Sequence, residues 1–123
     1  MNSALPREVE TLIAERIDSV SELEALLLIR QAGSQPWTAP TIARRLYSTD
    51  AKATQLLKAL HRRDLLTRNS KGYVYGPATP ELQAAVDLLA AVYVQELIAV
   101  TRCIHAKTAA LTEAADPAKA FAN

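Results

Sequence analysis

The sequence predicts a mainly α-helical domain that contains one two-stranded β-hairpin, with additional helices at both ends of the chain. Three observations lead to this prediction. Half of the 123 residues are hydrophobic, 22% are charged and only three are glycine, which is typical of a folded, helix-rich chain. Apolar residues recur at helical spacing over most of the chain. The pattern changes to alternation only between residues 65 and 75, as in two short strands.

Two helices are predicted in the first third of the chain. The first follows Pro6 and ends near Asp18, because apolar residues at helical spacing are interleaved there with acids and arginines. The second begins after Ser19, which has the spacing of a capping box with Glu22, and Gly33 can stop it. Its stretch "SVSELEALLLIRQAG" holds too many leucines for one exposed stripe, so we expect this helix at the centre of the core.

A short helix and a longer helix are expected next, separated by the turn "YSTD". Thr38 can cap the short helix, and Pro40 fits its first turn because the missing backbone donor costs little there. Ser48 or Thr49 can cap the longer helix, which is predicted over residues 50–63. The positions expected to face inward are Ile42, Ala43 and Leu46 in the short helix and Ala53, Leu57 and Leu60 in the longer one.

The pattern then becomes that of a β-hairpin. The stretch "LLTRNSKGYVY" predicts strands over residues 65–68 and 72–75, joined by a turn at which Gly72 supplies conformational freedom. Three aromatic residues, Trp37, Tyr73 and Tyr75, either line a ligand pocket or pack the hairpin on the core. Packing is the simpler account.

A single long helix is predicted after the hairpin. Thr79 caps it, Pro80 occupies its first position, and apolar residues continue to Ile104 or beyond. Because the helix is apolar on more than one side, we expect one face to cover the core and a second to form a homodimer. In the alternative, the N-terminal helices fold back over both faces of a monomer. The candidate dimer residues are Leu82, Val86, Leu89, Val92, Tyr93, Leu97, Val100 and Ile104.

We expect a single domain over residues 1–112, with a compact centre over residues 20–76 and a dimerisation helix over residues 79–112. The tail, residues 113–123, either docks through Phe121 or is loose.

The cysteine content, the N-terminal residues and the most apolar stretch indicate the cellular compartment of the protein. Cys103 is the only cysteine, which excludes an internal disulfide; a buried structural thiol is a simpler account of it than an oxidation sensor. The beginning of the chain lacks the pattern of a signal peptide. Asp87, Gln95 and Glu96 interrupt the most apolar stretch, so we expect no membrane span and a cytoplasmic protein.

The net charge of +1 hides a basic middle of the chain. Residues 40–72 carry eight Lys or Arg against two Asp, a balance of +6. Residues 1–39 carry three basic residues against six acids, and residues 73–123 carry three against five. This segregation favours a polyanionic partner.

The stretch "TIARRLYSTDAKATQLLKALHRRDLLTRNSKGYVYG" resembles the winged helix-turn-helix family. Ala43 and Leu46 match the small and apolar positions of that family's first helix, the inward positions of the longer helix match its recognition helix, and "DLLTR…GYVY" matches the continuation into the wing. Asp64 departs from the pattern, since Gly is common there. The resemblance covers residues 38–76; the flanking helices are similar only in architecture to the MarR- and PadR-like bacterial transcriptional regulators, in which such helices build a dimer.

This resemblance implies binding of double-stranded DNA, with the recognition helix in the major groove. Gln55 could pair with adenine in bidentate fashion and Thr54 could donate or accept, while Lys52, Lys58 and Arg62 would meet phosphates. Arg68 and Lys71 in the wing could follow the backbone or the adjacent minor groove. The candidate DNA-binding residues are Thr38, Arg44, Arg45, Thr49, Lys52, Thr54, Gln55, Lys58, Arg62, Arg68 and Lys71.

Four alternatives to parts of this interpretation remain open. Winged helices also serve as protein-interaction adaptors without DNA binding, and an effector-gated sensor is a further possibility. Leu56 could touch a thymine methyl group, although a buried role is the better expectation. Arg45 and Arg63 could pair with neighbouring or N-terminal acids instead of DNA.

Catalysis has little support in the sequence. His61 lies among arginines and His105 lies far along another helix, with no catalytic triad or metal-binding spacing around either. We therefore expect no enzyme activity, no cofactor and no metal.

Overall fold

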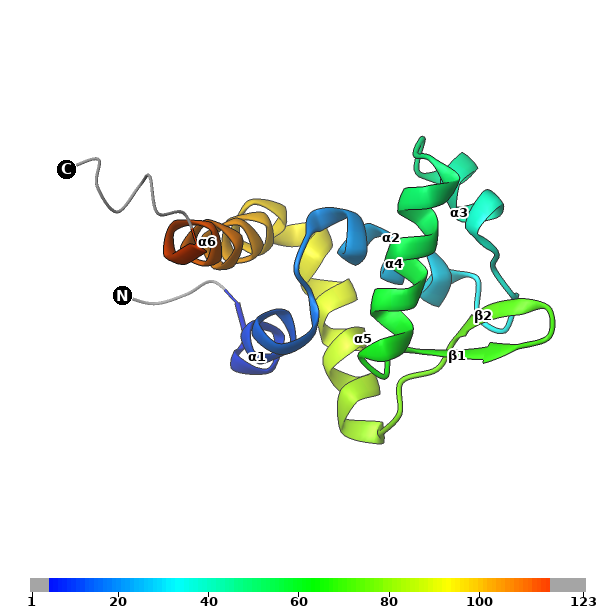
Figure 1. Cartoon of the computed structure of the whole chain (residues 1–123). Coiled ribbons are helices and arrows are strands. Elements are labelled where there is room, and N and C mark those ends of the chain that lie inside the picture. The colour runs from blue at the N-terminus through cyan, green and yellow to red at the C-terminus, as the bar shows by residue number, and fades with distance from the viewer. Residues whose placement is uncertain (1–4, 116–123) are drawn as a thin grey trace.

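The computed structural model describes residues 5–115, and it describes their side chains as far as residue 107. Within that part the chain is mainly helical with one antiparallel hairpin, which confirms the predicted fold class (Figure 1). The elements, in chain order, are α1 (Arg7–Arg16), α2 (Val20–Gln31), α3 (Ala39–Arg45), α4 (Asp50–Arg62), β1 (Leu66–Asn69), β2 (Gly72–Tyr75), α5 (Pro80–Gln95) and α6 (Leu97–Ala115). Phe121 and the last eight residues of the predicted tail lie outside the described residues.

The predicted caps begin three of the helices. Each cap hydroxyl accepts a hydrogen bond from the backbone N–H three residues later, at 3.1 Å for Ser19, 3.1 Å for Thr49 and 3.0 Å for Thr79. At α3 the Thr38 N–H donates to the Thr41 hydroxyl at 2.9 Å. Beyond the end of α2, Gly33 takes a φ of +68°, the left-handed conformation that commonly stops a helix.

The core lies between α2 and the helices around it. α4 packs on α2 and α3, whereas α1 packs on α5 and α6 (Figure 1). Leu23, Leu26 and Ile29 of α2 have no exposed surface, as expected for a central helix. From α4 the core receives the positions that the sequence predicted to face inward, Ala53, Leu57 and Leu60.

The hairpin begins one residue later than predicted. Leu65 is buried and its N–H donates to the Leu60 carbonyl at 3.1 Å, so it belongs to the exit from α4 and not to a strand. Asp64 makes this exit possible by adopting a φ of +67°, a left-handed conformation that Gly adopts most readily. In the hairpin itself Leu66 pairs with Tyr75 and Asn69 with Gly72.

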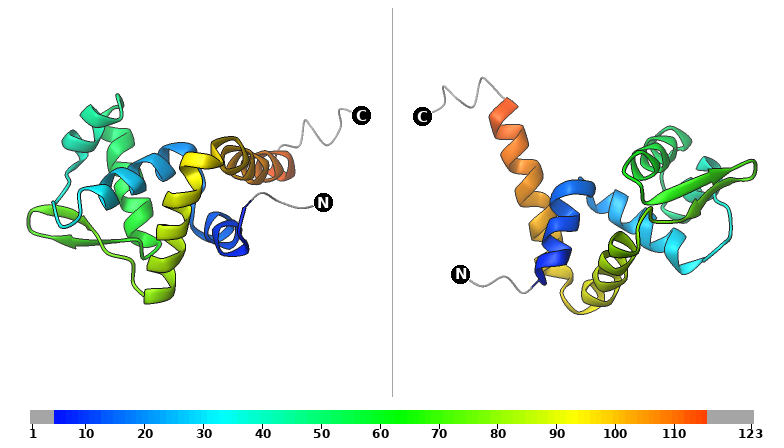
Figure 2. Two further views of the ribbon diagram at one scale, coloured as in Figure 1. Left: turned by 180° about the vertical axis from the view of Figure 1, so that it is seen from behind. Right: turned by 90° about the horizontal axis from the view of Figure 1, so that it is seen from below.

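The prediction of one continuous C-terminal helix was wrong. The helix breaks at Glu96, which has φ −122° and ψ 41°, and α5 and α6 are bent by 116°. Beyond the break α6 turns back and lies beside α1 (Figure 2). The physical reason is burial: Val100 and Ile104 lose all their exposure when α6 packs there.

Over the described range no single helix is both long and apolar enough to span a membrane. α5 and α6 pass this test of length and composition only when taken together, as a bent pair.

Candidate nucleic-acid interface

The outer face of α4 carries polar residues that the sequence assigned to DNA binding, Gln55 to a base and Lys58 and Arg62 to phosphates. Gln55, Lys58 and Arg62 are exposed along its centre, and Ala51 joins them in the first turn. Periodicity had not singled out Ala51, yet a small side chain at this position lets another surface approach the helix backbone closely. Leu56 is half-buried and packs on the core, in agreement with the expectation that it is not a reading residue.

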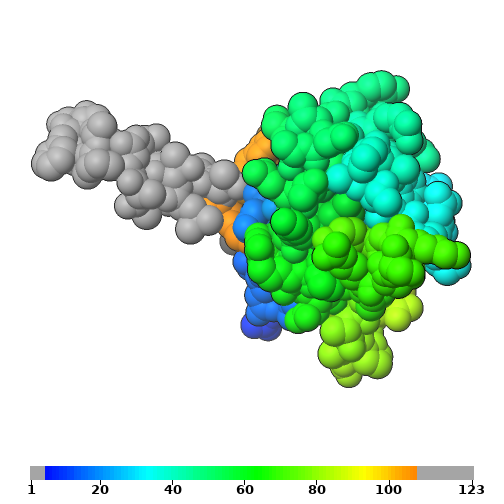
Figure 3. Space-filling view, turned by 45° about the vertical axis from the view of Figure 1, so that its right-hand side comes forward, coloured from blue at the N-terminus to red at the C-terminus, as the bar shows by residue number. Residues whose placement is uncertain are grey.

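A hollow of about 330 Å³ lies between α4, the hairpin and the beginning of α3. Figure 3 shows the face of the molecule on which these three segments meet. Both α4 and the hairpin contribute cations to the hollow. The predicted DNA-binding residues that line it are Thr38, Thr54, Lys58, Arg68 and Lys71.

Two of the predicted DNA-binding residues on α4 line a different hollow. Lys52 and Gln55 border a space of about 280 Å³ beside the start of α2, together with Ser21, Ser48 and Leu56. The predicted set on α4 therefore divides: Thr54 and Lys58 lie toward the hairpin, Lys52 lies toward α2, and Gln55 and Arg62 are exposed outside the hairpin hollow.

The hairpin is fixed in place by aromatic packing. Trp37 is buried and forms a bridge with Tyr73, in which the Trp37 N–H donates to the Tyr73 carbonyl at 2.7 Å and the Tyr73 N–H donates back at 2.8 Å. The Tyr73 ring meets the His61 ring edge-on at 5.6 Å between centroids, and the Arg68 guanidinium carbon lies 5.2 Å from the Tyr73 centroid. Tyr73 thus joins the hairpin to α4 and holds Arg68 at the hollow.

The hairpin tip is ordered by its own side chain. Asn69 accepts two hydrogen bonds through its side-chain oxygen, from the N–H of Lys71 at 2.8 Å and from the N–H of Gly72 at 3.1 Å. Asn69 and Ser70 both line the hollow, although the sequence had indicated only a turn here.

The arginines of α3 lie on its flank. Arg44 and Arg45 are exposed and border a small separate hollow with Thr41, and the Arg45 guanidinium carbon lies 5.7 Å from the Trp37 ring centroid. The exposed Thr49 uses its hydroxyl to cap α4. These three predicted residues lie outside the hairpin hollow.

Tyr47, in the turn between α3 and α4, was missed by the sequence reasoning. Its side chain is 97% exposed, and its backbone takes a φ of +53°. A bulky residue rarely adopts this left-handed conformation, and no pattern in the sequence announces it.

Arg63 is not available to a nucleic acid. It is half-buried at the end of α4 and pairs with Asp18 and Glu22. This confirms the alternative in which Arg63 pairs with N-terminal acids.

Four of the predicted dimer residues belong to the chain's own core. Val86, Leu89, Val100 and Ile104 have no exposed surface. The others, Leu82, Val92 and Tyr93, are half-buried, and Leu97 is 50% exposed. Exposed apolar side chains adjoin one another at the bend between α5 and α6, where Val94 is 84% and Ile98 67% exposed.

Cys103 and His105 lie on α6, and His61 lies on α4. Cys103 is half-buried on α6; its burial, and next the Glu10 carboxylate, raise the pKa of its thiol, which disfavours the reactive thiolate. Among the residues that the structure describes, no three His, Cys, Asp or Glu side chains lie close enough to hold a metal ion.

The chain matches no known family model, no curated protein and no solved structure.

Proposed function

We propose that this chain binds double-stranded DNA in a sequence-specific manner as a dimeric winged-helix protein, and that it is a bacterial transcriptional regulator of MarR- or PadR-like type. One observation carries the proposal. The exposed cations of α4 and of the hairpin, Lys58, Arg68 and Lys71, meet around one hollow. Asp18 and Glu22 pair instead with Arg63 at the other end of α4, so these acids do not neutralise the hollow.

In the proposed complex α4 enters the major groove and its outer face meets base edges. Gln55 reads adenine through its amide, and Thr54 donates to or accepts from a neighbouring base. Lys58 and Arg62 contact phosphates, while Arg68 and Lys71 of the hairpin follow the backbone beside the groove. Binding by occlusion of a promoter makes a repressor a simpler assignment than an activator.

The proposed partner for the second half-site is another copy of the chain. The bend between α5 and α6 leaves Val94, Leu97 and Ile98 exposed, and apolar surface of this kind favours self-association. This elbow replaces the straight-helix interface, because the four core residues of the predicted stripe are already buried within one chain.

The test is binding of the purified full chain to genomic DNA fragments over a salt series. We expect log affinity to fall linearly with log salt concentration. Lys58→Ala should reduce the slope by about 1, and Gln55→Ala should weaken discrimination between sequences with little change in slope. Arg102→Ala is the charge-matched control, since Arg102 is exposed on α6, away from the hairpin hollow. Affinity that does not depend on salt, or equal losses for Lys58→Ala and Arg102→Ala, would overturn the proposal.

A second candidate function is that of a winged-helix adaptor that binds another protein and no DNA. The exposed elbow is the observation that favours it. This alternative predicts a stoichiometric protein partner, lost on Ile98→Glu, and no DNA shift at any salt concentration.

A further inference from the structure

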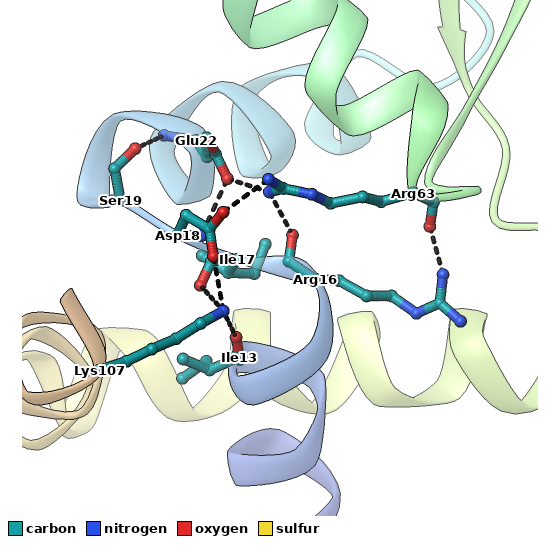
Figure 4. A network of polar contacts seen from close by, with 8 residues as sticks. All are labelled: Ile13, Arg16, Ile17, Asp18, Ser19, Glu22, Arg63 and Lys107. Carbon is teal, nitrogen blue, oxygen red and sulfur yellow. Dashed lines mark hydrogen bonds and ion pairs between the residues drawn. The ribbon is translucent and has the colours of Figure 1, made fainter. Parts of the chain in front are cut away.

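A polar junction joins α6 to the C-terminal end of the recognition helix (Figure 4). Its centre is Asp18, in the link between α1 and α2. Lys107, from α6, approaches Asp18 Oδ1 to 2.6 Å with its Nζ. The same Nζ donates to the carbonyl oxygens of Ile13 at 2.9 Å and Ile17 at 3.1 Å. Lys107 therefore binds two backbone carbonyls at the end of α1, where a cation also interacts well with the helix dipole.

The other oxygen of Asp18 is bound from α4. Arg63 donates to Asp18 Oδ2 at 2.6 Å, to the Arg16 carbonyl at 3.0 Å and to the Glu22 carboxylate. Arg16 returns a hydrogen bond to the Arg63 carbonyl, and its guanidinium lies 3.6 Å from the Asp64 carboxylate. The carbonyl of Arg63, the first residue after α4, and the carboxylate of Asp64 are thus both bound by Arg16 at the end of α1.

We propose that Asp18 couples the seating of α6 to the position of the recognition helix, with Lys107 and Arg63 as the two positioning residues. Lys107 and Arg63 do not need to touch each other, because each binds its own oxygen of one carboxylate. When α6 moves, the Lys107 ammonium leaves Asp18. The Asp18 carboxylate can then re-orient, which weakens its hydrogen bond to Arg63. Both cations are mostly buried, with side-chain exposures of 21% for Lys107 and 22% for Arg63. A change in the Asp18 carboxylate that they share therefore alters the ion pairs of both.

The coupling gives the proposed function a route of regulation. Any event that moves α6 would change how rigidly α4, and with it the outer face of α4, is held in place. The main such event would be the pairing of two copies at the elbow between α5 and α6. By linkage, DNA binding would in turn favour the seated position of α6. This consequence rests on the proposed function, whereas the coupling between α6 and the end of α4 does not.

The chain offers a matched control for this junction. Arg30 and Asp87 form an ion pair between α2 and α5, with Nε and Oδ1 3.0 Å apart and side-chain exposures of 34% and 48%. Arg30→Gln removes a cross-helix ion pair of the same type without touching α4 or α6.

The first experiment measures hydrogen exchange of the full chain without DNA. The amides of Arg63, Asp64 and Leu65, bonded to carbonyls near the end of α4 in the native structure, report on this region. We expect Lys107→Gln and Asp18→Asn each to speed their exchange, the double variant to add little, and Lys107→Arg to restore the slow rate. Arg30→Gln should leave these amides unchanged. The coupling would be overturned if the effects of Lys107→Gln and Asp18→Asn on the exchange rates were additive, or if Arg30→Gln accelerated the same amides equally. Either result would indicate only a general loss of stability.

The second experiment measures DNA affinity over a salt series. Because Lys107, on α6, is not among the residues that line the hairpin hollow, we expect Lys107→Gln to weaken binding by roughly threefold to tenfold with an unchanged salt slope. Wild-type affinity in Lys107→Gln would overturn the regulatory role, and a reduced slope would show that Lys107 is instead a direct phosphate contact. If the wild-type chain binds no DNA, the proposed function fails, and the exchange rates still decide the coupling.

Discussion

Gly72 lies so close to Trp37 that a Cβ added to it would be 2.4 Å from the Trp37 carbonyl oxygen. At this point Trp37, two residues before α3, and the first residues of β2 run backbone against backbone. The φ of Gly72 is +141°, which side-chain-bearing residues rarely adopt. The hairpin therefore owes its position over α4 to the absence of a side chain at one residue.

Gly72→Ala should be much more destabilising than Gly33→Ala. Gly33 also has a positive φ, +68°, but an added Cβ there meets nothing within 4 Å. We expect about 1 kcal/mol for Gly33→Ala from backbone strain alone, and a clearly larger loss for Gly72→Ala, where strain and collision combine. Urea unfolding of both variants measures the difference. Equal losses would mean that Trp37 and β2 move apart at little cost.

Asp18 should make the stability depend on pH in the acid range. The hydrogen bond from Lys107 lowers the pKa of Asp18 below the ordinary value of 3.8, burial opposes this shift, and Arg63 adds to it. A lowered folded-state pKa stabilises the fold above the unfolded value, and this contribution disappears as the pH falls through the folded value. Asp18→Asn should therefore be less stable than wild type at pH 7, and the two should converge toward pH 3. The measurement is the urea midpoint of unfolding of wild type and Asp18→Asn across this pH range, with Asp87→Asn as control. A difference in midpoint that does not change with pH would contradict the pKa shift.

Local rules were enough to predict most of the fold. Ser19 and Thr79 were identified as caps, and Thr49 as one of two candidates with Ser48, because a cap depends only on the next three residues. The break at Glu96 could not be predicted in this way, because apolar residues at helical spacing continue on both sides of it. Only packing of α6 on α1, residues far apart in the sequence, decides that the helix bends.

The types of residue at the candidate interface could be predicted from the sequence. The direction in which each side chain lies was harder to predict. Helical spacing separated the inward Leu57 from the outward Lys58, as the structure confirms. Spacing could not tell that Lys58 lies toward the hairpin while Lys52 lies toward α2, since this depends on where the hairpin folds. Nor could it place Arg63 in an ion-pair cluster, because its partners Asp18 and Glu22 lie more than forty residues earlier.

Tyr47 should be replaceable with a gain in stability. Its side chain is 97% exposed and its φ is +53°. The backbone is therefore strained at Tyr47, and the side chain makes too little packing contact to offset the strain. Tyr47→Asn should raise the free energy of unfolding by about 0.5 to 1 kcal/mol, because Asn tolerates the left-handed conformation. Thermal or urea unfolding measures the change, and a loss of stability would show that the ring makes contacts in solution. A simultaneous loss of DNA affinity would place Tyr47 in the interface, where strained residues often serve a function.

The exposed elbow should control self-association. Val94, Leu97 and Ile98 present apolar surface at the bend between α5 and α6, and a buried charge in such an interface is strongly unfavourable. Ile98→Glu should therefore convert a dimer into a monomer in light scattering across a concentration series. It should also weaken binding to a two-fold symmetric DNA site more than binding to a single half-site, because a dimer holds two recognition helices at once. Ala106→Glu adds the same charge at another exposed position of α6 and should stay dimeric. A wild-type chain that remains monomeric at every concentration, or an Ile98→Glu dimer as stable as wild type, would refute the elbow as the contact between copies.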